Sequence, residues 1–121
     1  MGREGPYKTA LSKRIEERLP GSVILKQDPN LRQGISDLLI LWEFVWAALE
    51  VKAYRGAPDR PNQGYYVNLL HELSYAAVIY PENEEEILDE LELTLRSRQA
   101  AIRNTFFLEP KQTRVGKLRR G

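Results

Sequence analysis

Cysteine is absent from the 121-residue sequence, so the chain can form neither a disulfide bond nor a thiolate metal site. There is a single histidine, and any bound metal ion must therefore be held by oxygen atoms or by that one side chain. Long hydrophobic runs are missing too, because the apolar stretches over residues 38–41 and 44–49 are far too short to cross a bilayer. The polar N-terminus also lacks the apolar core of a signal peptide. These absences predict a cytoplasmic protein with no membrane-spanning segment.

Charge is spread unevenly along a chain whose composition, with 42% hydrophobic and 29% charged residues, is that of one ordinary folded domain. The last eleven residues contain no acid and five bases, which are Lys111, Arg114, Lys117, Arg119 and Arg120. This end carries +5 against a total of +1, so the rest of the chain carries −4. We therefore expect one domain over residues 1–109 and a basic tail over residues 110–121. Such a tail is typical of a nucleic-acid contact, and the alternative is that it only adds solubility.

Hydrophobic periodicity predicts an α/β domain with the order helix, three strands, helix, strand, helix. One helix is expected over residues 6–19, a second begins after Asn62, which is its expected N-cap, and a third begins at Pro81. Strands are expected over residues 22–26, 35–41, 44–54 and 76–80. The second and third strands are separated by so short a turn that they should form an antiparallel hairpin.

One of these strands carries two charged side chains, Glu50 and Lys52, although both of its faces are otherwise largely apolar. Residues two apart share a face of a strand, so Glu50 and Lys52 should lie on the same side. A symmetric turn centred between residues 43 and 44 would pair Leu39 with Ala48 and place Asp37 opposite Glu50. Two like charges at directly opposed positions, with Cβ atoms about 4.5–5.5 Å apart, are destabilising unless a positive charge lies between them.

A divalent cation would supply that positive charge. An oxygen-lined site with few carboxylates suits Mg²⁺ or Mn²⁺, which keep water ligands and accept phosphate oxygens. Lys52 could then orient or deprotonate the attacking water, or stabilise the charge that develops on phosphorus. Together these residues indicate phosphodiester hydrolysis. The structural alternative is a salt bridge between Glu50 and Lys52, with Asp37 capping the turn after Gly34. For any one of these residues alone this alternative is favoured, but for the three together the catalytic site is favoured.

The pattern GISD, a hairpin, LEVK and a glutamine that opens a helix resembles the PD-(D/E)XK nuclease superfamily, and within it the VRR-NUC type found in phages and bacteria. The resemblance covers residues 4–91. It implies a restriction-endonuclease-like core of helix, three strands, helix and strand, here with an extra C-terminal helix. It also implies a set of site residues: Asp37, Glu50 and the Val51 carbonyl as metal ligands, Lys52 as a catalytic residue, and Gln63 as a supporting residue near the metal.

The family's glutamate on the first helix has three candidates in this chain, Glu4, Glu16 and Glu17. Glu4 shares the inward apolar stripe of that helix if the helix extends back to it, and its spacing to Asp37 resembles that in the family. We therefore favour Glu4 and expect Glu16 and Glu17 on the surface. Ser36 stands where the family usually has proline, a change that leaves the neighbouring carboxylate in place.

These observations predict a Mg²⁺- or Mn²⁺-dependent DNA endonuclease with no small-molecule cofactor. The resemblance further implies a homodimer that cuts branched DNA such as a four-way junction. Exposed aromatic side chains are expected to supply the dimer contact: Tyr65, Tyr75, Phe106 and Phe107. Further DNA contacts are expected from Lys26, Arg32 and Gln33, which flank the loop before Asp37, and from the basic tail. The rival function is a non-catalytic nucleic-acid-binding module on the same fold, and an RNA-directed nuclease also fits these residues.

Overall fold

The helices and strands follow one another along the chain in the predicted order. The computed structural model describes residues 4–27, 34, 36–59 and 61–106. In chain order the elements are α1 (Glu4–Arg18), β1 (Val23–Lys26), β2 (Leu38–Trp42), β3 (Val45–Val51), α2 (Gln63–Leu73), β4 (Tyr75–Ile79), the 3-10 turn η1 (Pro81–Asn83) and α3 (Glu84–Phe106). The α/β class is therefore confirmed, as is the order of helices and strands.

The four strands form one mixed sheet in the order β1-β2-β3-β4. β2 pairs antiparallel with both β1 and β3, whereas β3 and β4 are parallel. The β2–β3 hairpin turns at Glu43 and Phe44, whose φ angles of 42° and 75° have the positive sign that a type I′ hairpin turn requires. This turn places Leu39 opposite Ala48, so the predicted register is confirmed.

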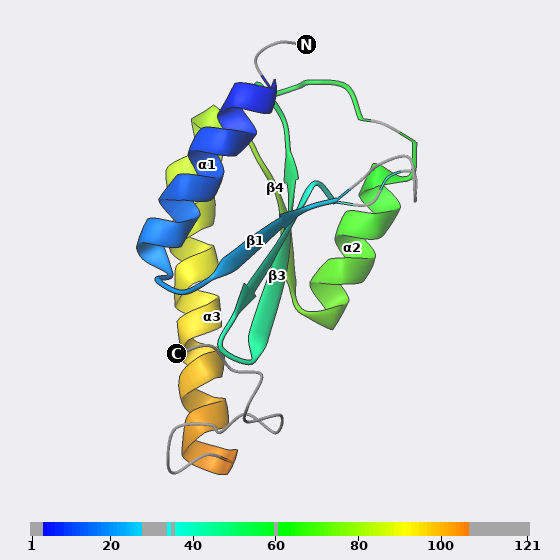
Figure 1. The fold of residues 1–121 in the computed structure, drawn as a ribbon. Helices are drawn as coiled ribbons and strands as arrows, with labels where there is room; N and C mark the ends of the chain where they lie inside the picture. Colours follow the sequence, from blue (N-terminus) through cyan, green and yellow to red (C-terminus); the bar gives the residue numbers. More distant parts are fainter. Residues whose placement is uncertain (1–3, 28–33, 35, 60, 107–121) are drawn as a thin grey trace, which may run out of the picture.

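The helices cover the two faces of the sheet unequally (Figure 1). α1 and α3 lie on one face, while α2 lies on the other face and packs on β3 and β4. The main core fills the space between the sheet and α1 and α3. Its buried side chains include Leu11, Ile15, Ile40, Ala47, Leu49, Val51, Leu88, Leu91 and Leu95. Full burial of a large aliphatic side chain contributes about 1.5–3 kcal/mol, so this layer fixes the strands that carry the candidate site.

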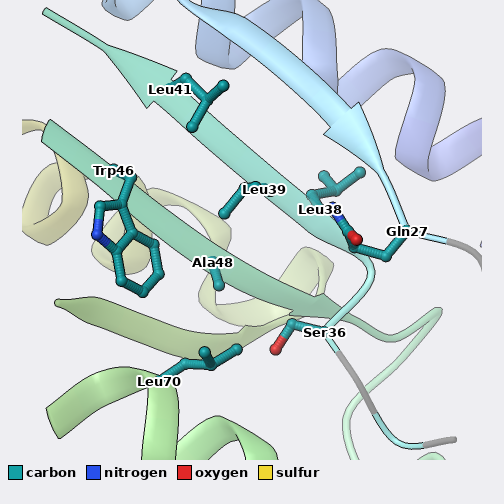
Figure 2. A pocket seen from close by; sticks show the side chains of 8 residues that line it. All are labelled: Gln27, Ser36, Leu38, Leu39, Leu41, Trp46, Ala48 and Leu70. Atoms are coloured by element: carbon teal, nitrogen blue, oxygen red, sulfur yellow. The ribbon is translucent and has the colours of Figure 1, made fainter. Parts of the chain in front are cut away.

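Apolar side chains of β1 and β2 remain exposed on the face that α2 only partly covers. Val23, Leu25 and Leu41 are 51%, 43% and 38% exposed. Beside them, a cavity of about 320 Å³ is lined by Gln27, Ser36, Leu38, Leu39, Leu41, Trp46, Ala48 and Leu70 (Figure 2). None of these lining side chains is ionisable, so this cavity offers no acid, base or charged metal ligand.

Several boundaries differ from the predicted ones. α1 begins at Glu4 rather than at residue 6, β2 begins only at Leu38, and β3 ends at Val51 rather than at residue 54. Asn62 occupies the N-cap position of α2 as predicted, but its side chain makes no capping hydrogen bond. None of the helices in the described part of the chain has the length and apolar character that crossing a membrane requires.

The expected patch of exposed aromatic residues is wrong at Tyr75. This residue is 6% exposed, and its hydroxyl donates a hydrogen bond of 2.8 Å to the Glu90 carboxylate on α3. It is buried because it is the first residue of β4 and lies on the face that α3 covers. Tyr65 is 63% exposed, as expected. The Phe106 side chain and Phe107 lie outside the described residues.

Candidate active site

Two acidic side chains meet where β2 begins and β3 ends. Asp37 directly precedes β2 and Glu50 belongs to β3, and the last recorded β2–β3 pair, Leu38 with Leu49, puts them at the next opposed position. Both residues are buried, at 4% and 1% exposure. Glu50 is one of the groups that lower the pKa of Asp37, so the two carboxyl groups lie close enough to interact. The predicted juxtaposition of Asp37 and Glu50 is therefore present in the folded chain.

Asp37 is held as an anion by groups from two other elements. Its Oδ2 accepts a hydrogen bond of 2.8 Å from the backbone N–H of Val51, and its Oδ1 accepts one of 3.0 Å from Nζ of Lys8 on α1. Burial alone would raise the pKa of Asp37, but these two hydrogen bonds, the charge of Lys8 and the contact with Glu50 outweigh it. The pKa of Asp37 therefore lies below its usual value.

Gln63 links the glutamate to the lysine. It is the first residue of α2 and only 3% exposed. Its Nε2 donates a hydrogen bond to Oε2 of Glu50, and its Oε1 accepts one of 3.1 Å from Nζ of Lys52. This orientation of the amide is the one that its neighbours require, because a carboxylate only accepts and an ammonium group only donates. Gln63 thus bridges the two charged groups, and its role as a supporting residue near a metal stays a prediction.

Lys52 is fixed by three acceptors. Besides Gln63, its Nζ donates to the carbonyl oxygen of Pro58 at 3.0 Å and lies 3.0 Å from Oδ1 of Asp59. An ammonium group has three N–H donors, and these three oxygens match them. The backbone N–H of Lys52 donates to the Ile79 carbonyl at 2.9 Å, which continues the parallel pairing of β3 with β4. Pro58 and Asp59 were not predicted as site residues, because they belong to a segment without hydrophobic periodicity.

Helices α1 and α2 both begin at this end of the sheet (Figure 1). The residues at this end also line a cavity of about 210 Å³. It is lined by the predicted site residues Glu4, Glu50, Val51, Lys52 and Gln63 and by Ala53, Tyr54, Ala57 and Pro58. Charged and amide side chains contribute to this lining, and the cavity has room for several water molecules. The cavity therefore brings together all of the predicted catalytic and metal-binding residues except Asp37, which is not among its lining residues.

Glycine is required at position 34, in the segment that leads to Asp37. Gly34 has a φ of +89°, and a Cβ atom there would lie 2.5 Å from the Pro61 carbonyl oxygen and 2.7 Å from atoms of Asn62. No side chain fits such a close approach. Gly34 thus allows the chain before β2 to pack against the turn that opens α2, which places Asp37 and Gln63 at the same end of the sheet.

Lys8 is a further site residue that was not predicted from the sequence. Its Nζ lies 3.0 Å from Oδ1 of Asp37 and 3.4 Å from Oε2 of Glu4. A signal was available, because Glu4 and Lys8 are four residues apart and such pairs lie side by side on a helix. Glu16 and Glu17 are exposed, as expected.

The remaining predicted DNA contacts are only partly described. Lys26 is exposed at the end of β1. The loop residues Arg32 and Gln33 and the tail residues Lys111, Arg114, Lys117, Arg119 and Arg120 lie outside the described residues. Over the described ranges, no three Asp, Glu or His side chains form a group that could hold a metal ion. Asp37 and Glu50 form a pair, and Lys8 stands between Asp37 and the third candidate, Glu4.

In chemical terms, the site offers two adjacent carboxyl groups, a fixed ammonium group and a small polar cavity. Comparisons of the chain with protein-family models, with curated proteins and with solved structures found no match. The function is therefore inferred from the residues of the site themselves.

Proposed function

We propose that this protein is a metal-dependent nuclease that hydrolyses phosphodiester bonds in DNA, on a core of the restriction-endonuclease-like type. The observation that carries the proposal is the opposed position of two buried carboxyl groups, Asp37 and Glu50, beside Lys52, which directly follows β3. Buried carboxyl groups in contact are destabilising unless a proton or a cation lies between them. A fold that keeps Glu50 in the lining of a polar cavity, with Asp37 opposite it, is therefore suited to bind a cation.

The residues present fit a divalent ion with hard oxygen ligands. Asp37, Glu50 and the Val51 carbonyl would hold Mg²⁺ or Mn²⁺, and the two carboxylates supply the charge that such ions prefer. When bound, the ion lowers the pKa of a water molecule and polarises a phosphate oxygen. A two-carboxylate site leaves positions open for water and phosphate, as a catalytic site needs.

Lys52 stabilises negative charge on the phosphate. Lys52 lines the cavity, and Gln63 and Pro58 hold its ammonium group in place, so its positive charge is already positioned when charge develops on a phosphate oxygen. Gln63 orients Glu50 at the same time, because a single amide group bonds both side chains. These are the roles that the chain's own residues play in the proposed reaction.

Cleavage of labelled DNA with Mg²⁺, Mn²⁺ or EDTA tests this function. The wild type should cut in either metal and not in EDTA. Asp37→Asn and Glu50→Gln should each abolish cleavage but leave DNA binding nearly intact, and Lys52→Ala should lower turnover by about 10²–10³-fold with little change in metal affinity. Glu16→Gln, at an exposed position on α1, is the matched control and should cut like the wild type. Binding without cleavage in both metals would instead identify a non-catalytic module.

The preferred substrate and the assembly state are tested separately. We expect a homodimer that prefers a four-way junction, because two symmetric active sites at a fixed separation can make paired cuts. Tyr65 remains a candidate for the dimer contact, whereas Tyr75 is excluded by its burial. Light scattering and a panel of junction, flap, duplex, single-stranded DNA and RNA substrates measure the two properties. A strict monomer at micromolar concentration that cuts linear duplex as fast as a junction would contradict this expectation alone.

A further inference from the structure

Lys8 places a positive charge between two carboxylates of the candidate site. Its Nζ lies 3.0 Å from Asp37 and 3.4 Å from Glu4, and its side chain is only 23% exposed. The contact with Glu4 joins neighbours on one helix, but the contact with Asp37 joins residues 29 positions apart. Glu4 in turn lines the same cavity as Glu50. Lys8 therefore belongs to the site and not to the outer surface of α1.

An ordinary surface ion pair does not account for this arrangement. Exposed pairs contribute about 0–1 kcal/mol, and their partners remain in water. The Asp37 side chain is 3% exposed, and its other oxygen is already bonded to the Val51 N–H. Removing the ammonium group would leave a buried anion beside a second buried carboxyl group. The ammonium group of Lys8 consequently neutralises negative charge that a metal ion would otherwise neutralise at this position.

The charges around the cavity match a single divalent ion. Four carboxyl groups take part, Glu4, Asp37, Glu50 and Asp59, and two ammonium groups contact them, Lys8 and Lys52. With every group ionised the sum is −2, which one divalent ion neutralises. Without Lys8 the sum over these described groups would be −3, and its ammonium group would no longer separate Glu4 from Asp37.

We propose that Lys8 takes the place of a second metal ion between Glu4 and Asp37, and so limits the site to one divalent ion. The inference rests on the proposed metal-dependent function and specifies its metal stoichiometry. Lys8 acts as a positioning residue, since its recorded contacts are with carboxylates of the site. The stoichiometry is a property of the free protein and can be measured without substrate.

Counting bound Mn²⁺ per chain tests this proposal, with free Mn²⁺ quantified by electron paramagnetic resonance. The wild type should bind one ion and Lys8→Met should bind two. Lys8→Arg, which keeps the charge, should bind one. Glu4→Gln combined with Lys8→Met should return the count to one, because it removes a ligand of the added ion. Lys13→Met, at an exposed position on the same helix, is the control and should bind one ion.

The outcomes separate this proposal from the proposed function. A wild type that binds no Mn²⁺ would refute both. A count of one for the wild type and also for a folded Lys8→Met would refute the role of Lys8 and leave the metal-dependent nuclease standing. Circular dichroism melting establishes that each variant is folded; if Lys8→Met does not fold, Lys8→Gln replaces it under the same criterion.

Discussion

Replacing Gln63 by leucine tests whether its buried amide group holds the site together. The change keeps the approximate size of the side chain but removes the hydrogen bonds to Glu50 and Lys52. A hydrogen bond to a charged group contributes about 1.5–3 kcal/mol, so the two together amount to about 3–6 kcal/mol. Lys52 keeps its contacts with Pro58 and Asp59, and leucine gains from burial, which offsets part of the loss. We therefore expect the free energy of unfolding to fall by about 2–4 kcal/mol.

Urea unfolding followed by circular dichroism measures this change, and a thermal melt should show a fall in Tm on the order of 10 °C. Asn68→Leu, at an exposed position on the same helix, is the matched control and should stay within about 0.5 kcal/mol of the wild type. Gln63→Glu keeps an acceptor for Lys52 but sets a second carboxylate beside Glu50, so its destabilisation should shrink as the pH is lowered. A loss below about 1 kcal/mol in Gln63→Leu would show that the amide contributes little net stability.

Three further perturbations have defined outcomes. The folded state lowers the pKa of Asp37, so the ionised carboxylate stabilises the fold fully above the unfolded pKa of about 3.9, and this stabilisation is lost as the pH falls through the folded pKa. The free energy of unfolding should therefore fall more steeply between neutral and acid pH in the wild type than in Asp37→Asn. Parallel curves for the two proteins would contradict this. Trp42→Phe removes the 2.9 Å hydrogen bond from Nε1 to the Pro20 carbonyl and should lower the free energy of unfolding, measured by urea titration, by about 1–3 kcal/mol. An unchanged urea midpoint would show that water replaces this hydrogen bond. Deleting residues 111–121 should weaken DNA binding and reduce the slope of log affinity against log salt by up to about 4.5, which is 0.9 for each of five phosphate contacts; an unchanged slope would identify a passive tail.

Most of the fold could be predicted because its core follows simple periods. Leu11 and Ile15 repeat at helical spacing in α1 and are fully buried. The hairpin register was predictable because a two-residue turn leaves one symmetric pairing, and that pairing brought Asp37 opposite Glu50. Such patterns show on which face of a helix or sheet each side chain lies, and Asp37 and Glu50 lie on the same face of the sheet.

The contacts that complete the site were not predictable in the same way. Lys8 and Asp59 reach the site from segments whose position relative to the sheet depends on tertiary packing. The 52–62 segment contains no apolar period, so nothing in it indicated that Pro58 would present a carbonyl to Lys52. Tyr75 was misjudged because aromatic character alone does not distinguish an exposed ring from one that lies under α3.

The two-residue Glu43–Phe44 turn fixes the number of residues that the chain can have between Asp37 and Glu50. A one-residue slip in a hairpin moves every side chain of one strand to the opposite face. A single insertion or deletion in this turn would therefore turn Leu38 and Ile40 out of the core and, in the same step, separate the two carboxyl groups. In a scan of single-residue insertions across residues 38–51, folding and metal binding should consequently be lost together, whereas an insertion within residues 53–57 would leave the strand pairing unchanged.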